Sequence, residues 1–253
     1  MAISAVGSIA ISNGVNTLSV SPTAIGNILV LTVPNTGSST NTPLTAVSGG
    51  GVTTWVFVEG VGYNAPGYGI DLWYGVVTST GASTITITAS SPSYGSMALG
   101  CLEFSGGSAG TWSLDGGGSS QNGHTSSFSY PSLTPSGANE LYVATCVSSS
   151  LSTSGQTSGF TYIVPLGSTG NEANGTLVYN VAASSPTAQS PNQSTSLAYW
   201  QAAAILLIFT ATPPVKSRRP KGLPAAVRRA NNYFKRESGL WEPERGLIVP
   251  RAA

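Results

Sequence analysis

Short apolar runs follow one another along the first 210 residues at intervals typical of β-strands. Each run either alternates apolar and polar residues or is apolar throughout, and Asn-Gly, Gly-Gly and Ser-Pro turn signals separate the runs. Nothing before residue 216 has a sustained helical period. Many short strands at this spacing predict an all-β sandwich or barrel. The runs cover residues 8–12, 16–21, 27–33, 53–60, 70–77, 83–90, 97–104, 126–133, 139–147, 159–165, 175–182 and 199–209.

The second series of runs repeats the first. Residues 27–31 (NILVL) resemble residues 139–143 (NELYV), which lie 112 positions later. Six further apolar positions match at a constant offset of 105. These matches pair Leu72, Tyr74 and Val76 with Leu177, Tyr179 and Val181, and Leu99, Leu102 and Phe104 with Ala204, Leu207 and Phe209.

Two halves of this size bury their apolar faces most simply by stacking face to face. We therefore predict a jelly-roll-like β-sandwich of residues 1–212, built from two similar halves at about 1–108 and 120–212. Two separate small sandwiches are the alternative.

Residues 197–219 (LAYWQAAAILLIFTATPPVKSRR) resemble a membrane anchor with a basic flank. Gln201 interrupts the stretch and Pro213-Pro214 end it. The stretch also aligns with the predicted strand at 97–104, and a strand buried on both faces reads as a continuous apolar run. A core strand is the favoured interpretation, with no membrane span.

Charge divides the chain into two parts. Only 8% of residues are charged, against about a quarter in typical proteins. Residues 1–215 contain six acidic residues and no Lys or Arg, a net charge of −6. Residues 216–253 contain ten basic and three acidic residues, a net charge of +7, so the whole chain carries +1. This asymmetry indicates a body with an interaction arm.

The arm, residues 213–253, is predicted to be extended except for one short helix near 224–237. Leu223, Val227, Ala230 and Phe234 form an apolar stripe at helical spacing, and Gly239 is a natural helix stop. The aromatic and basic side chains together favour docking to a protein, with nucleic acid and a membrane surface as alternatives. The predicted docking residues are Arg218, Arg219, Val227, Arg228, Arg229, Phe234, Lys235, Arg236 and Trp241.

Candidate catalytic chemistry is sparse, and we expect neither an enzyme nor a cofactor. His124, the only histidine, lies in a Ser/Gly-rich run and is predicted to be a solvated loop residue, although Asp115 is close in sequence. One His and two distant Cys offer no metal-ligand cluster. Cys101 and Cys146 lie in apolar runs and are predicted to be buried free thiols, with a single buried disulfide as the alternative.

Aromatic side chains suggest a second kind of role. Tyr63 and Tyr68 lie in the Gly/Pro-containing segment GVGYNAPGYG, and they are the best candidates for exposed rings that stack on a sugar. A carbohydrate-binding module for attachment to a host cell surface is therefore the alternative function.

The order of motifs in residues 20–210 resembles jelly-roll domains of bacteriophage virion proteins, especially siphophage minor tail and head-decoration proteins. In the first half the likeness lies in GNILVLTV, VSGGGVTTWVFV, DLWYGVV, GASTITITAS and LEFSGG. In the second half it lies in NELYVATCV, GFTYIV, LVYNVA and WQAAAILLIF. Related domains also occur in bacterial surface proteins. The arm is not part of the likeness.

This resemblance implies a structural protein of a virus particle, made in the host cytoplasm, with contact to a host surface glycan as a further expectation. The N-terminal segment MAISAVGSIAISNG is a poor signal peptide, in agreement with that site of synthesis. We expect the body to face outward and the arm to dock on other virion proteins, in several symmetric copies.

Overall fold

In the computed structural model, the described part of the protein consists of antiparallel strands without a helix, which confirms the all-β prediction. The structure describes residues 2–36, 46–62, 68–88, 97–150, 152–153, 155–166, 174–185, 187–189 and 191–213. The chain divides into two compact units, Met1–Thr212 and Pro213–Ala253. All described strands belong to the first unit, and the predicted helix near 224–237 lies outside the described residues.

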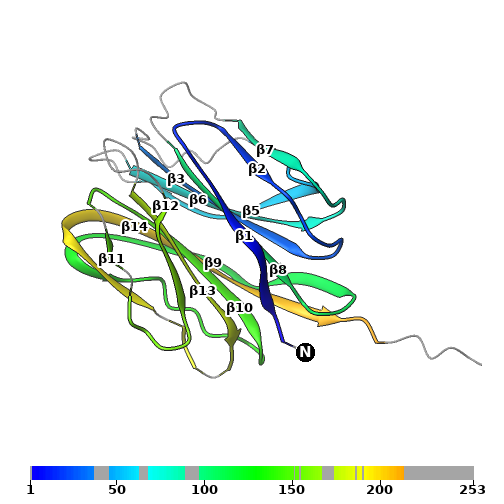
Figure 1. Ribbon diagram of the computed structural model, residues 1–253. Coiled ribbons are helices and arrows are strands. Elements are labelled where there is room, and N and C mark those ends of the chain that lie inside the picture. Colours follow the sequence, from blue (N-terminus) through cyan, green and yellow to red (C-terminus); the bar gives the residue numbers. More distant parts are fainter. Residues whose placement is uncertain are drawn as a thin grey trace, which may run out of the picture. The chain divides into compact units, whose positions relative to one another are not determined.

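The described strands form three sheets (Figure 1). The N-terminal sheet has the order β1-β8-β3-β6-β5, and a small sheet has the order β2-β7-β4. The C-terminal sheet has the order β11-β14-β10-β13-β12, and β9 pairs with β14. The strands are β1 (Ser4–Asn13), β2 (Thr17–Val20), β3 (Ile28–Thr36), β4 (Ala46–Gly49), β5 (Val52–Gly62), β6 (Tyr68–Val77), β7 (Ser83–Thr88), β8 (Ala98–Ser105), β9 (Gly110–Ser129), β10 (Glu140–Ser148), β11 (Ser152–Thr153), β12 (Thr161–Leu166), β13 (Asn174–Ala183) and β14 (Asn192–Ala211).

The two larger sheets arrange their strands in the same order. The series β1-β8-β3-β6-β5 corresponds, position by position, to β9-β14-β10-β13-β12. Pairing agrees as well, because Val30 lies opposite Tyr74 and Val143 lies opposite Tyr179. The sequence offset of 105 therefore relates β6 and β13 with their side chains on equivalent faces.

The offset of 112 between residues 27–31 and 139–143 is wrong by one position. It equates Leu29 with Leu141, but these side chains enter different cores. Val30 and Val143, which are 113 positions apart, enter the same core. Side chains alternate along a strand, so a shift of one residue exchanges the two faces.

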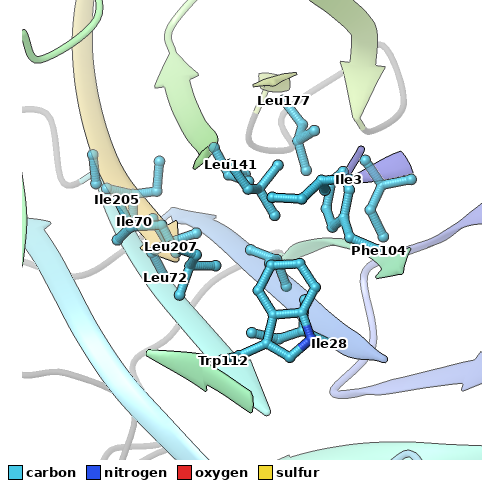
Figure 2. Close-up of a cluster of buried hydrophobic side chains, with 14 of the residues drawn as sticks. Ile3, Ile28, Ile70, Leu72, Phe104, Trp112, Leu141, Leu177, Ile205 and Leu207 are labelled. Carbon is cyan, nitrogen blue, oxygen red and sulfur yellow. The ribbon is translucent and has the colours of Figure 1, made fainter. Parts of the chain in front are cut away.

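A central core lies between the two large sheets (Figure 2). Two aromatic pairs belong to it: Phe104 meets Tyr179 edge-on at 5.3 Å, and Trp112 lies 5.0 Å from Phe209. The Trp112 indole N–H also donates to the Gly26 carbonyl oxygen at 3.0 Å. The core includes Ile28, Val30, Ile70, Leu72 and Phe104 from the N-terminal sheet, and Leu141, Val143, Leu177, Ile205 and Leu207 from the C-terminal sheet.

Each large sheet also buries its other face. The outer face of the N-terminal sheet packs against the small sheet in an N-terminal core that includes Leu29, Trp73, Leu99, Leu18 and Ile85. The outer face of the C-terminal sheet forms a C-terminal core that includes Tyr142, Val178, Leu206, Phe128 and Tyr130. The body therefore stacks its two large sheets and also has a separate core in each half.

Strand β9 lies largely in the Gly/Ser-rich region for which only residues 126–133 are predicted as strand. Its glycines allow close approach of neighbouring side chains. A Cβ atom at Gly118 would lie 2.7 Å from the Glu59 Cβ atom, and one at Gly123 would lie 2.8 Å from the Trp200 ring. Because β9 starts at Gly110, the second series of strands begins before the predicted boundary near residue 120.

Strand β14 contains most of the stretch that resembles a membrane anchor. It pairs with β10 on one side and β9 on the other, and Ala202 to Leu207 are buried. The core-strand interpretation is therefore confirmed. Among the described residues, no helix is long and apolar enough to cross a membrane.

Truncation of Ile28 tests the central core. Ile28 is fully buried there, whereas Ile25, three residues earlier, is 71% exposed. We expect Ile28→Ala to lower the free energy of unfolding by about 2–5 kcal/mol, because it removes packed methyl groups and leaves a cavity. Ile25→Ala, the matched control, should change it by less than about 0.5 kcal/mol. Equal urea midpoints for the two variants would contradict the assigned core.

Candidate functional site

Most of the residues predicted for docking and glycan contact lie outside the described residues. This holds for Tyr63 and for the nine arm residues from Arg218 to Trp241. Tyr68 is the first residue of β6, where its backbone lies opposite Thr36, and its side chain is not described. The candidate sites below therefore come from other residues of the body.

Buried carboxyl groups are the first unusual feature of the body. Asp71, Glu103 and Glu140 are each at most 6% exposed, yet residues 1–215 contain no Lys or Arg. A buried charge without a partner costs several kcal/mol. Glu103 and Glu140 meet this cost by two different routes, through neutral hydrogen-bond donors and through a proton that is bound more tightly.

Glu103 on β8 follows the first of these routes. Its carboxylate accepts hydrogen bonds from the Thr23 backbone N–H at 3.0 Å and from the Thr23 hydroxyl at 2.9 Å. The Asn27 side-chain amide donates to it at 2.6 Å, and the Ala24 N–H lies at 3.4 Å. These neutral donors satisfy the buried carboxylate oxygens with hydrogen bonds. Glu103 thereby fixes the loop between β2 and β3 onto the sheet.

Asp115 and Glu140 follow the second route. The Ser136 N–H donates to the Asp115 carboxylate at 2.6 Å, and the Gly137 N–H donates to Glu140 Oε1 at 2.5 Å. Glu140 Oε2 is buried and has no hydrogen-bond donor directed at it. If this oxygen carries a proton, it can donate a hydrogen bond to the neighbouring Asp115 carboxylate.

The pKa values of the pair move in opposite directions, as expected for two carboxyl groups that share one proton. Burial raises the pKa of Glu140, and the hydrogen bond to Asp115 and the negative charge of Asp115 raise it further. Burial also acts to raise the pKa of Asp115. Hydrogen bonds from Ser136 and Glu140 outweigh that effect, and the pKa of Asp115 is lowered. Of the two carboxyl groups, Glu140 is therefore the one that binds a proton more tightly.

Both cysteines are free and buried, which confirms the prediction of free thiols. Burial raises the pKa of Cys101 well above its ordinary range, and the charge of Glu103 adds to that increase. Burial likewise raises the pKa of Cys146. Thiolate is the nucleophilic form of cysteine, so neither residue is prepared for nucleophilic chemistry.

His124 lies on a strand and not in a loop, which corrects the prediction. It occupies β9 opposite Tyr199 of β14, and the two exposed rings stack 4.1 Å apart at an interplanar angle of 16°. Leu114, the neighbour of Asp115, lies opposite Leu207 in the same ladder, so the positions of Asp115 and His124 are separated by about eight residues of β14, or roughly 25 Å. The two side chains therefore do not form the acid–histidine pair of a catalytic triad.

Two pockets open on the described surface of the body. One, of about 560 Å³, lies where β1 departs from its pairing with β8 between Val6 and Ala10, and Leu29, Cys101 and Glu103 also line it. The other, of about 390 Å³, lies beside β12 and β13 and includes Phe160, Asn180 and Gln189. Within the described residues, no three His, Cys, Asp or Glu side chains gather as metal ligands do.

The shared proton predicts a pH-dependent stability. Glu140 binds its proton more tightly in the folded chain than at its ordinary pKa of 4.5, so its contribution to stability is present at or below that pH and declines as pH rises further. Asp115, with a lowered pKa, contributes in the opposite sense and loses its contribution as pH falls through the acid range.

Glu140→Gln retains a donor for Asp115 and removes the titrating group. Relative to the wild type, this variant should gain a few degrees in melting temperature as pH is raised from 4.5 to 8. Glu59→Gln, which changes the net charge equally, is the control. Parallel pH profiles for the two variants would show that Asp115 and Glu140 do not share a proton.

Comparison with known proteins assigns no family to this arrangement. Searches against protein-family models, curated proteins and solved structures gave no match. The features that bear on function are therefore those of the body's own residues. Neutral donors surround Glu103, Glu140 binds its proton more tightly, and both thiols are buried. One pocket includes Glu103 and the other is lined only by uncharged residues.

Proposed function

We propose that the chain is a non-enzymatic structural protein of a virus particle, of the minor tail or decoration type, whose body consists of two jelly-roll-like halves. The observation that carries this proposal is the order in which the strands pair. In a jelly roll, a long hairpin of eight strands is rolled into two facing sheets. Its strands therefore pair from the outside of the sequence inward.

The first half has this nested pairing. Strand β1 pairs with β8, β2 with β7 and β3 with β6, while the two central strands, β4 and β5, pair with β7 and β6 in different sheets. The N-terminal sheet and the small sheet then face each other across the N-terminal core. These are the two sheets of a jelly-roll-like sandwich.

The second half has the same nesting with fewer, longer strands. Strands β9 and β14 pair along most of their length, and register shifts at Ser194/Ala198 and Ile205/Leu207 mark irregularities where such strands bend. Each of these strands takes the place of two in the first half. Strand β10 pairs with β13 inside them, and β11 and β12 are the central strands.

Jelly rolls are frequent in viral capsid proteins and in lectins, and the fold alone does not choose between these roles. The side chains support a structural role. The thiols are buried, His124 and Asp115 lie apart, and the buried carboxyl groups stabilise loops. Three apolar cores in one unit suit a rigid particle component.

The basic arm is the proposed attachment device. The body carries a net charge of −6 and the arm +7, so the arm is complementary to an acidic surface such as the body of a neighbouring copy. Val227, Phe234 and Trp241 supply apolar anchors of the kind that fill pockets at interfaces. Other virion proteins, in symmetric copies, are the proposed partners, and nucleic acid is not.

The alternative function is that of a carbohydrate-binding module for attachment to a host cell. Its original basis, the rings of Tyr63 and Tyr68, lies outside the side chains that the structure describes. The pocket that contains Phe160, Asn180 and Gln189 supports this alternative on a different basis, because it combines an aromatic ring with two side-chain amides.

Deletion of the arm tests the structural proposal. Particles produced with residues 1–215 in place of the full chain should lack the protein, because its docking segment is absent, while thermal melting of the body is unchanged. Arg228→Glu with Arg229→Glu should reduce incorporation at least tenfold, and a Glu237→Gln variant is the control. Quantitative mass spectrometry of purified particles measures each outcome. Normal incorporation of residues 1–215 would refute docking through the arm.

A further inference from the structure

We propose that the pocket beside β12 and β13 binds an uncharged saccharide of one or two rings. This amide pocket has a volume of about 390 Å³, and Thr157, Ser158, Phe160, Asn180, Thr187 and Gln189 line it together with two alanines and a serine. Small-molecule sites generally occupy about 300–1,000 Å³. The proposal does not depend on the virion role and concerns residues that are remote in sequence from the arm.

The two amide side chains of the pocket are held in one orientation by a chain of hydrogen bonds. The Ala182 N–H donates to Asn180 Oδ1 at 2.9 Å, and Asn180 Nδ2 donates to Gln189 Oε1 at 2.9 Å. Gln189 Nε2 in turn donates to the Thr187 carbonyl oxygen at 2.9 Å. Each bond fixes which end of the amide is oxygen and which is nitrogen.

This chain of bonds uses only part of the hydrogen-bonding capacity of the amides. A side-chain amide has two N–H donors and two acceptor positions. Asn180 and Gln189 each use one donor and one acceptor position in these bonds. A further N–H and a further lone pair on each residue are left for a ligand, and a sugar hydroxyl can accept from the first and donate to the second.

The backbone around the amides is also fixed before a ligand arrives. Gln189 exchanges two backbone hydrogen bonds with Leu133, at 2.7 and 3.1 Å, and is only 6% exposed. Among the other lining residues, the Thr157 hydroxyl accepts from the Asn192 N–H at 3.2 Å. A preformed site loses little entropy on binding.

Phe160 supplies the apolar element that saccharide sites require. Its ring is half-buried and meets Tyr142 edge-to-face, with centroids 5.6 Å apart at 89°. Tyr142 is fixed in turn, because its hydroxyl donates to the Pro131 carbonyl oxygen at 2.8 Å. An ordered aromatic ring beside paired amides matches a sugar, which has both C–H surface and hydroxyl groups.

The charge of the pocket restricts the ligand to neutral sugars. All nine lining residues are uncharged, and residues 1–215 contain no Lys or Arg that could pair with an anion. A phosphate, sulfate or carboxylate would therefore lose hydration without gaining a cationic partner. An amine would likewise find no carboxylate among the lining residues. Hydroxyl and acetamido groups have no such requirement.

Binding of methyl glycosides to the full-length chain tests this inference. The probes are the methyl glycosides of glucose, galactose, mannose and N-acetylglucosamine, their disaccharides, and glucuronic and sialic acid as charged comparisons. We expect at least one neutral probe to bind at millimolar concentration or below, as measured by saturation-transfer NMR and calorimetry. Absence of binding by every neutral probe, or a preference for the acidic sugars, would overturn the proposal.

Variants locate the binding site. Asn180→Asp removes both N–H donors of the side chain and introduces a negative charge, and it should weaken binding about tenfold or more. Ser158→Tyr, at an exposed position on the rim, should block the pocket without disturbing a core. Asn122→Asp, at an exposed position on β9, is the matched control and should bind normally. Melting temperatures verify that each variant is folded.

Loss of binding on Tyr63→Ala or Tyr68→Ala, with normal binding by the Asn180 and Ser158 variants, would assign the sugar to the other candidate site and refute this one. Incorporation into particles is a separate measurement, so a failure of sugar binding leaves the docking experiment to be judged on its own result.

Discussion

Burial of both faces of the two large sheets is the constraint on which the rest of the structure depends. A strand between two cores has few positions for a charged side chain, and β10, which is buried at all nine of its positions, contains Glu140 as its one acidic residue. The same constraint produces the continuous apolar runs of β8 and β14 and leaves the polar positions to Ser, Thr and Gly. An open sandwich with one solvated face per sheet would have a far more regular alternation.

The shortage of charge has a cost where acidic residues remain. Without basic side chains in the body, Glu103 is held by Thr23 and Asn27, and Glu140 binds its proton more tightly beside Asp115. Both solutions attach a loop to the end of a strand. These polar interactions therefore hold individual loops in place, while the apolar cores supply the bulk of the stability.

Much of the fold is predictable from the sequence, because alternation and repetition are local signals. The repeat at an offset of 105 identifies the apolar stretch around Ala202 as a strand, and the structure agrees. The face of β10 is misassigned because a shared Asn precedes β3 and β10 but does not fix the register. Most of strand β9 is not predicted, for a different reason. Glycine is required at positions 118 and 123 because the side chains of Glu59 and Trp200 approach from other strands and leave no room for a Cβ atom.

The candidate sites are less predictable than the fold, because they join residues that only the folded chain brings together. Asp115 meets Glu140 through the turn at Ser136 and Gly137, and Asn180 meets Gln189 across the connection after β13. Neither pair has a motif or a characteristic spacing. Exposed aromatic residues and basic clusters are easier to recognise in a sequence, because each residue carries its own signal.

The position of β14 has a mechanical consequence. It is the last strand of the body, it leads directly toward the arm, and it is hydrogen-bonded to β9 and β10 on its two sides. A force applied along the axis of β14 at its C-terminal end would load the hydrogen bonds on both edges together, instead of opening them one after another. Strand β14 therefore resists such a force in shear.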